Sequence, residues 1–249
     1  MLRRKTKPYG RCYVDDVTNA EYPSVTSILN VLQKNLDYWK MNTMGDAIIA
    51  KLKEAFEGKR LLDLEAIVKE SKKAPNDYRD LKGNRGTFVH NVIEKRLNGE
   101  DITEPRGKDP KLSALMFQLD KWLENTKTEP VLVEAFLYSE KHGYAGTVDL
   151  VAYQTRNGHD KDLALIDFKT SKNLYSPAIW QLAAYCQAYS ELYNKTPSIA
   201  YIMHLDYDRC IISEAMHIHK EEIEIEIQKF LHIFEAFKAM NEKHLQESS

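Results

Sequence analysis

The sequence predicts an α/β (α+β) fold, because helical patterns fill most of its first half and strand patterns begin at residue 130. Three apolar runs follow one another there, and a long helical pattern separates them from further apolar runs. The order of helices, strand meander, crossover helix, strand and final helix predicts a mixed sheet flanked by helices. We expect one domain over residues 1–249, with a helical N-terminal part (1–82), a core (83–220) and a C-terminal helix (221–249).

The N-terminal part is expected to open with a short, irregular basic arm, MLRRKTKPYGR. In YPSVTSILNVLQK (22–34), apolar residues recur at helical spacing and Ser24 is the expected N-cap. The helical patterns that follow cover residues 46–58, 61–71 and, after the breaker KKAPND (72–77), 85–97. A further helix is predicted over 111–125 after a loop at 100–110.

The second half contains the strand patterns. The meander is predicted over 130–139, 146–154 and 162–170. The crossover helix is expected at 176–193 with Ser176 as its N-cap and Pro177 at its first position. The remaining expected elements are a strand at 197–207, a strand at 214–220 and a helix from 221.

Composition excludes several classes of protein. The 249 residues are 43% hydrophobic, enough for a sizeable core, but no apolar run approaches the roughly 18 residues of a membrane span. The charged start has no apolar segment behind it, so we expect a soluble, cytoplasmic protein. The three scattered cysteines, Cys12, Cys186 and Cys210, predict neither a disulfide scaffold nor an iron-sulfur cluster. The net charge of -2 leaves nucleic-acid binding to local basic patches.

Carboxylates interrupt all three strands of the predicted meander. Asp167 and Lys169 are two residues apart and therefore share one face of a strand. Asp149 lies among apolar residues on the neighbouring strand, where Gly146 is expected to allow a tight turn before it. Glu134 interrupts the first strand in the same way. A buried, unpaired carboxylate costs several kcal/mol, so these acids require partners.

A shared divalent cation would remove that cost. Carboxylates select hard ions such as Mg²⁺ or Mn²⁺, which polarise a phosphoryl oxygen and acidify a bound water. The ammonium of Lys169 could then stabilise charge that develops on a phosphate. The pattern therefore predicts metal-dependent phosphodiester hydrolysis. The alternative for each acid alone is a strand-edge carboxylate that pairs with a nearby lysine.

Asp149 followed by Asp167-Phe168-Lys169 resembles the core motif of the PD-(D/E)XK nuclease superfamily, which has a restriction-endonuclease-like core. Three further features resemble its RecB-type branch: a histidine on an upstream helix (His90), the sequence GTVD at 146–149, and Gln181-x-x-x-Tyr185 on the helix after the strand of Lys169. The segments YPSVTSIL and YAGTVDLVA also resemble the mitochondrial genome maintenance exonuclease and its phage and bacterial relatives.

The resemblance implies a role for each matching residue. His90, Asp149 and Asp167 would bind the metal, with the carbonyl of Phe168 as a further ligand. Lys169 would be the catalytic lysine, and Glu134 would hold a second ion or a metal-bound water. Gln181 and Tyr185 would position the substrate strand, with a role of Tyr185 in the core as the alternative. His90 could likewise be a helix histidine that binds no metal.

The function implied is a Mg²⁺- or Mn²⁺-dependent deoxyribonuclease, an exonuclease that prefers single-stranded DNA or frayed ends. A structure- or sequence-specific endonuclease, a non-catalytic nucleic-acid-binding subunit and a small-molecule phosphoesterase are the alternatives. The sequence contains no G-x-x-x-x-G-K-[ST] motif, so ATP-driven unwinding would come from a helicase or recombination partner. The resemblance implies a bacterial or phage-infected cell as the location.

Overall fold

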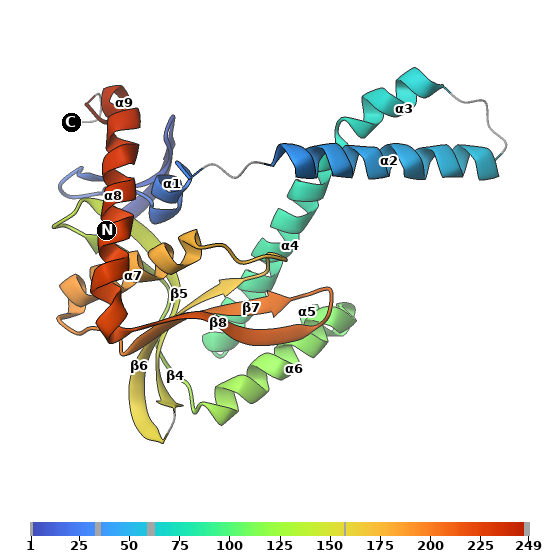
Figure 1. Ribbon diagram of the computed structural model, residues 1–249. Helices are drawn as coiled ribbons and strands as arrows, with labels where there is room; N and C mark the ends of the chain where they lie inside the picture. Colours follow the sequence, from blue (N-terminus) through green and yellow to red (C-terminus); the bar gives the residue numbers. More distant parts are fainter. Residues whose placement is uncertain (1, 33–35, 59–62, 157, 247–249) are drawn as a thin grey trace. The chain divides into compact units, whose positions relative to one another are not determined.

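The computed structural model describes residues 2–32, 36–58, 63–156 and 158–246 (Figure 1). The chain forms two compact units, one of residues 1–32 and 89–249 and the other of residues 33–88. The division falls within helix α4 (Ala74–Leu97). The first unit contains both sheets and every predicted site residue.

The larger sheet has five strands in the order β4-β5-β6-β7-β8 (Figure 1). Strands β6 and β7 are parallel, and the other neighbouring pairs are antiparallel. Helix α7 (Pro177–Tyr193) makes the crossover that the parallel pair requires. The mixed sheet flanked by helices that the sequence predicts is confirmed. The strands are β4 (Glu129–Ser139), β5 (Tyr144–Arg156), β6 (His159–Lys169), β7 (Ile199–Asp206) and β8 (Ile211–His219).

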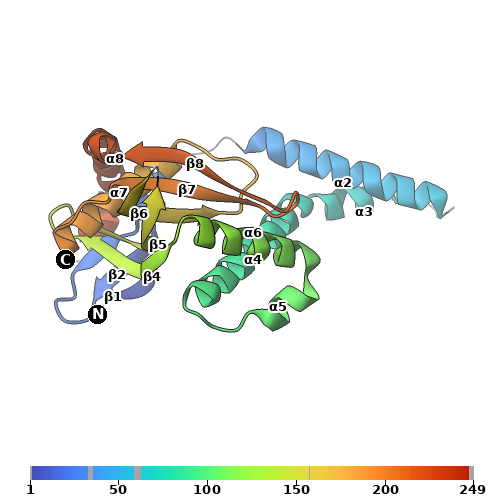
Figure 2. The same cartoon turned by 90° about the horizontal axis from the view of Figure 1, so that it is seen from below.

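Helices cover both faces of this sheet (Figure 2). One core cluster joins the sheet to α7 and α8 (Lys220–Met240), and contains Leu165 and Phe230. The other joins it to the end of α4 and to α6 (Pro110–Asn125), and contains Ile166. Because side chains alternate along β6, the successive residues Leu165 and Ile166 belong to opposite clusters.

The N-terminal residues form a second sheet, so the expectation of an irregular arm in a helical N-terminal part is wrong here. Its antiparallel strands are β1 (Leu2–Lys7), β2 (Gly10–Asp15) and β3 (Glu21–Pro23), in that order. Strand β1 lies at the edge, with Arg3 and Arg4 exposed and Lys5 and Lys7 partly exposed, so it shows no apolar alternation. The buried positions of this sheet lie mainly on β2, at Cys12, Tyr13 and Val14.

The helix that follows begins where the sequence predicts. Ser24 caps α1 (Val25–Leu29), and its hydroxyl accepts a 3.0 Å hydrogen bond from the backbone N–H of Ser27. The helix ends at Leu29, earlier than expected, and residues 33–34 of the predicted helix lie outside the described residues. At α7, the side chain of Ser176 makes no capping hydrogen bond, because its backbone is already helical.

The unit of residues 33–88 is helical where it is described. It contains α2 (Asp37–Glu57), α3 (Leu64–Ser71) and the first part of α4. The predicted break at 72–77 is shorter than expected, since α4 begins at Ala74; residues 61–62 of the predicted helix lie outside the described residues.

Two short helices complete the other unit. The expected loop at 100–110 contains the short helix α5 (Thr103–Lys108), and α9 (Glu242–Gln246) follows α8. No helix within the described ranges is long and apolar enough to cross a membrane.

Candidate metal and active site

Three predicted site residues lie together where α4, β4 and β5 meet. The Nδ1 atom of His90 is 3.8 Å from Oδ2 of Asp149 and 4.0 Å from Oε1 of Glu134. One ligand atom from each of the three residues lies within 4.8 Å of the other two. An ion with ligand bonds of about 2.1 Å needs ligand atoms about 3 to 4 Å apart. Small side-chain movements would therefore let these residues hold one divalent ion.

The electrostatics of this group indicate a shortage of positive charge. Burial and, next in size, the charge of Asp167 raise the pKa of Asp149 to about 8, against the lowering effect of His90. Burial lowers the pKa of His90, but the nearby carboxylates of Glu134 and Asp149 outweigh burial, so the net shift is upward. A divalent cation favours the ionised carboxylate and the neutral imidazole. The donor set therefore fits such an ion.

Glu134 has an unusual backbone conformation for a strand residue, with φ of 46°. Its neighbours Val133 and Ala135 pair with Leu150 and Val148, which places Glu134 opposite Asp149 at a point where the ladder is interrupted. A left-handed conformation at a residue other than glycine costs about 1 to 3 kcal/mol and persists where the surroundings fix it. Such outliers cluster at functional sites.

Asp167 and Lys169 form an ion pair on one face of β6, as strand periodicity predicts. Lys169 Nζ is 2.6 Å from Asp167 Oδ2, and the two side chains are 29% and 2% exposed. Burial lowers the pKa of Lys169, but the charges of Asp167 and Asp149 outweigh it and the net shift is upward. Lys169 is therefore held as an ammonium ion. Asp167 is not in the group formed by His90, Glu134 and Asp149.

Phe168 connects the group of His90, Glu134 and Asp149 to the ion pair of Asp167 and Lys169. Its backbone N–H donates a 2.6 Å hydrogen bond to Oδ2 of Asp149, the same oxygen that faces His90. Its buried ring packs edge-on to the His90 ring, with centroids 6.4 Å apart. The described contact involves the N–H of Phe168, and a role for its carbonyl as a metal ligand stays a prediction.

Gln181 and Tyr185 lie behind Asp167, in the interior. They are 7% and 3% exposed. Gln181 Nε2 donates to Asp167 Oδ1 (2.9 Å) and to the hydroxyl of Tyr185 (3.1 Å). The two residues share one face of α7, as their spacing predicts. The hydrogen bonds of their side chains are with each other and with Asp167, where the resemblance implies contact with the substrate.

Gly146 has a packing role that the sequence did not suggest. It lies inside β5, paired with Leu137, and not in the tight turn that we expected. A Cβ atom at this position would lie 2.3 Å from Cε1 of Tyr185. Glycine is therefore required because the Tyr185 ring occupies the space beside the strand.

Tyr13 and Thr147 are not among the predicted site residues. Their hydroxyl oxygens are 3.1 Å apart, and Thr147 precedes Asp149 by two residues. The only local signal is the apolar run CYV, which stands between Gly10 and Asp15 and is typical of a short strand. Nothing in that run indicates its distant partner.

The model of the PD-(D/E)XK nuclease superfamily matches residues 63–242. The chain belongs to this superfamily. The match covers His90 and both carboxylates of the motif, and it confirms the superfamily that Asp149 and Asp167-Phe168-Lys169 predict. Strands β1 to β3 lie outside the matched residues. No curated protein matches the sequence.

Two solved structures resemble this chain only distantly. A candidate exonuclease of Eubacterium rectale is 8% identical, with 64% of this chain and 68% of that chain covered and a TM-score of 0.43. The alkaline exonuclease LHK-Exo of Laribacter hongkongensis, in complex with dAMP, is 14% identical, with 90% and 94% covered and a TM-score of 0.38.

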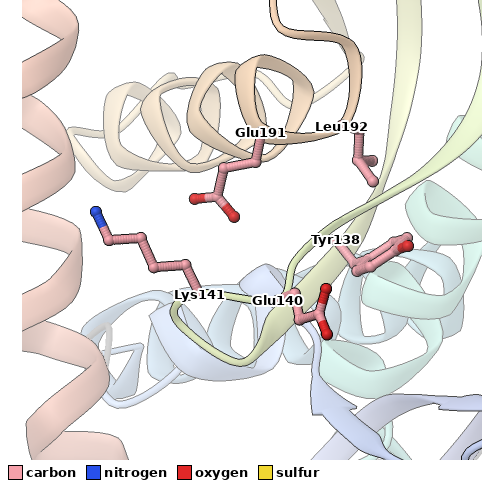
Figure 3. A pocket seen from close by; sticks show the side chains of 5 residues that line it. All are labelled: Tyr138, Glu140, Lys141, Glu191 and Leu192. Carbon is pink, nitrogen blue, oxygen red and sulfur yellow. The ribbon is translucent and has the colours of Figure 1, made fainter.

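A cavity of about 400 Å³ lies apart from this group of residues (Figure 3). It is bordered by the end of β4, the turn after it and the end of α7. Glu191 in its wall accepts hydrogen bonds from Ser139 (3.0 Å) and Gln187 (2.8 Å). None of the predicted site residues lines this cavity, which is formed by Tyr138, Glu140, Lys141, Glu191 and Leu192.

Proposed function

We propose that the chain is a metal-dependent DNA exonuclease that hydrolyses phosphodiester bonds, with a preference for single-stranded DNA or frayed ends. The observation that carries the proposal is the position of one atom, Oδ2 of Asp149. It lies 3.8 Å from His90 and accepts a hydrogen bond from the residue between Asp167 and Lys169. The proposed metal ligands and the partly exposed Lys169 therefore lie close together.

His90, Glu134 and Asp149 would hold the ion, and Asp167 lies close enough to Asp149 to raise its pKa and could complete the ligand set. Mg²⁺ or Mn²⁺ there would polarise the scissile phosphate and lower the pKa of a bound water. Because His90 supplies nitrogen and the other ligands supply oxygen, the donor set suits Mn²⁺ as well as Mg²⁺.

The remaining proposed site residues would place a positive charge at the phosphate or hold the carboxylates in position. Lys169 would place its ammonium against a phosphate oxygen and stabilise the charge that develops there. Gln181 would hold the Asp167 carboxylate, and the Phe168 N–H would hold that of Asp149. Each of these groups is fixed by a hydrogen bond or ion pair before substrate arrives, so little reorganisation accompanies the reaction.

The preference for DNA ends is supported by the resemblance of residues 22–29 and 144–152 to exonucleases of this kind. These two segments contact each other, because Ser24 and Ala145 form an isolated β-bridge. The contact places the N-terminal sheet beside the strand that carries Asp149. The alternatives, an endonuclease and a non-catalytic binding subunit, are separated from the proposal by experiment.

The test is digestion of end-labelled linear and circular single-stranded DNA with Mg²⁺, Mn²⁺ or EDTA. We expect metal-dependent loss of the linear strands, intact circles, and a loss of activity of at least about 100-fold in Lys169→Ala. Lys195→Ala is the matched control, since Lys195 contacts Tyr153 and none of the proposed site residues. Cleavage of circles would favour an endonuclease. DNA binding without cleavage under any metal would favour the binding subunit.

A further inference from the structure

Tyr13 of the N-terminal sheet reaches both strands of the proposed metal site. Its hydroxyl is 3.1 Å from Oγ1 of Thr147 on β5, and its ring packs edge-on to Phe136 on β4, with centroids 5.4 Å apart. Tyr13 itself is 1% exposed. A single buried side chain therefore touches β4 and β5 together.

The two residues that Tyr13 contacts are cross-strand partners of each other. Phe136 lies two residues after Glu134, and Thr147 lies two residues before Asp149. Tyr13 thus contacts the regular strand pair next to the point where the ladder is interrupted. The left-handed conformation of Glu134 requires that the strands on either side of it stay in register.

Other contacts fix the same segment of β5. Ser24 bridges to Ala145, and the Tyr185 ring fills the space beside Gly146. The residues that lead to Asp149 are therefore held from the N-terminal sheet on one side and from α7 on the other.

We propose that Tyr13 is a positioning residue for the metal site, and this inference rests on the proposed function. Tyr13 holds β4 and β5 in the register that keeps Glu134 left-handed and directs its carboxylate and that of Asp149 toward His90. The conformation costs about 1 to 3 kcal/mol, so the strand returns to an extended conformation when the restraint is weakened. The carboxylate of Glu134 then turns away from His90.

The test is Mn²⁺ binding by isothermal titration calorimetry, on the full chain without DNA. Tyr13→Phe removes the hydroxyl alone, and Thr147→Val removes the other half of the same hydrogen bond. We expect each to raise the Kd for Mn²⁺ roughly 3- to 10-fold, at the low end of outer-shell effects because Tyr13 acts through the strands. The double variant should bind no more weakly than either single variant, since all three lack the same contact.

Tyr22→Phe is the matched control. Tyr22 is the cross-strand partner of Tyr13 in the same sheet, but its ring packs on Tyr138, with centroids 5.7 Å apart. Its Mn²⁺ affinity should equal that of the wild type. Melting temperatures without metal show whether each variant folds. If Tyr13→Phe does not fold, Thr147→Val alone tests the inference.

Wild-type affinity in both Tyr13→Phe and Thr147→Val would overturn the inference while leaving the proposed function intact. Equal weakening in Tyr22→Phe would also overturn it, because the effect would then belong to the sheet and not to Tyr13. No Mn²⁺ binding by the wild type would instead contradict the proposed function itself.

Discussion

The side-chain amide of Gln181 donates a 2.9 Å hydrogen bond to the carboxylate of Asp167, from a position that is only 7% exposed. The same nitrogen donates to the hydroxyl of Tyr185, so both of its hydrogens are used within the protein. This arrangement favours a role for Gln181 in orienting Asp167, where the resemblance implies contact with the substrate strand.

Gln181→Ala should therefore lower kcat by about 10- to 100-fold and leave KM nearly unchanged, because Asp167 loses the partner that orients it. Steady-state kinetics on end-labelled single strands measures the two constants. Gln187→Ala is the control, since Gln187 lies on the same helix and contacts Glu191. A rise in KM with unchanged kcat would instead make Gln181 a substrate contact.

Gly146→Ala should destabilise the protein by about 1 to 3 kcal/mol, because the new Cβ would overlap the ring of Tyr185. Urea denaturation measures the change. Gly45→Ala is the matched substitution, at a helical glycine with no heavy atom within 4 Å of the added Cβ, and it should stabilise by about 0.5 to 1 kcal/mol. Equal effects of the two substitutions would rule out the overlap as the cause.

Asp149→Asn should stabilise the metal-free protein at pH 8. The folded pKa of Asp149 is raised to about 8 by burial and by Asp167, so folding takes up a proton between the unfolded pKa and that value. The contribution of Asp149 to the free energy of unfolding therefore falls as pH rises from its unfolded pKa to its folded pKa. Asparagine carries no such charge, and its oxygen can still accept from Phe168.

We expect the melting temperature of Asp149→Asn at pH 8 to exceed that of the wild type by at least about 2 to 4 °C, and the difference to vanish near pH 4. Saturating Mn²⁺ should reverse the order, because only the wild type gains stability from binding. A variant that is less stable than the wild type at pH 8 in EDTA would contradict the burial of an uncompensated charge.

Glu214→Gln tests a polar cluster away from the proposed active site. Burial raises the pKa of Glu214, but hydrogen bonds from Arg156 and Trp122 outweigh it and lower the pKa to about 2. The Arg156 contact includes a 3.0 Å hydrogen bond, and both side chains are mostly buried. A lowered carboxyl pKa contributes stability above the unfolded value, which is lost as pH falls toward 2.

The substitution should therefore cost about 2 kcal/mol at pH 7, and the difference from the wild type should shrink below pH 4. Denaturation at several pH values measures it. Glu235→Gln removes an exposed partner of Lys238 and should change stability by less than about 0.5 kcal/mol. A loss of stability in Glu214→Gln that is the same at every pH would indicate that packing, and not the carboxylate charge, causes the loss.

Local rules were enough to predict much of the fold and part of the candidate site. A strand period of two places Asp167 and Lys169 on one face whatever their neighbours are. Serine before an apolar helical pattern predicts the cap at Ser24, because the cap hydrogen bond spans only three residues. The superfamily follows from the order and spacing of a few such local signals.

The remaining features depend on contacts between distant residues. Tyr13 contacts Thr147, which lies 134 positions away in the sequence. The edge strand β1 carries charged side chains, so it has no apolar alternation from which a sheet could be predicted. A positive φ is usually signalled by glycine or asparagine, and at Glu134 the residue type gives no such signal. The grouping of Glu134 with His90, while Asp167 pairs with Lys169, follows from that conformation and was not predictable from periodicity.

Anomalous diffraction from crystals grown with Mn²⁺ would locate the ion relative to His90, Glu134 and Asp149. We expect one strong peak about 2.0 to 2.3 Å from Nδ1 of His90 and from carboxylate oxygens of Glu134 and Asp149. Asp149→Ala should lose the peak together with nuclease activity. A fully occupied ion elsewhere, or an active Asp149→Ala variant with no ion between these residues, would show that these residues do not form the catalytic metal site.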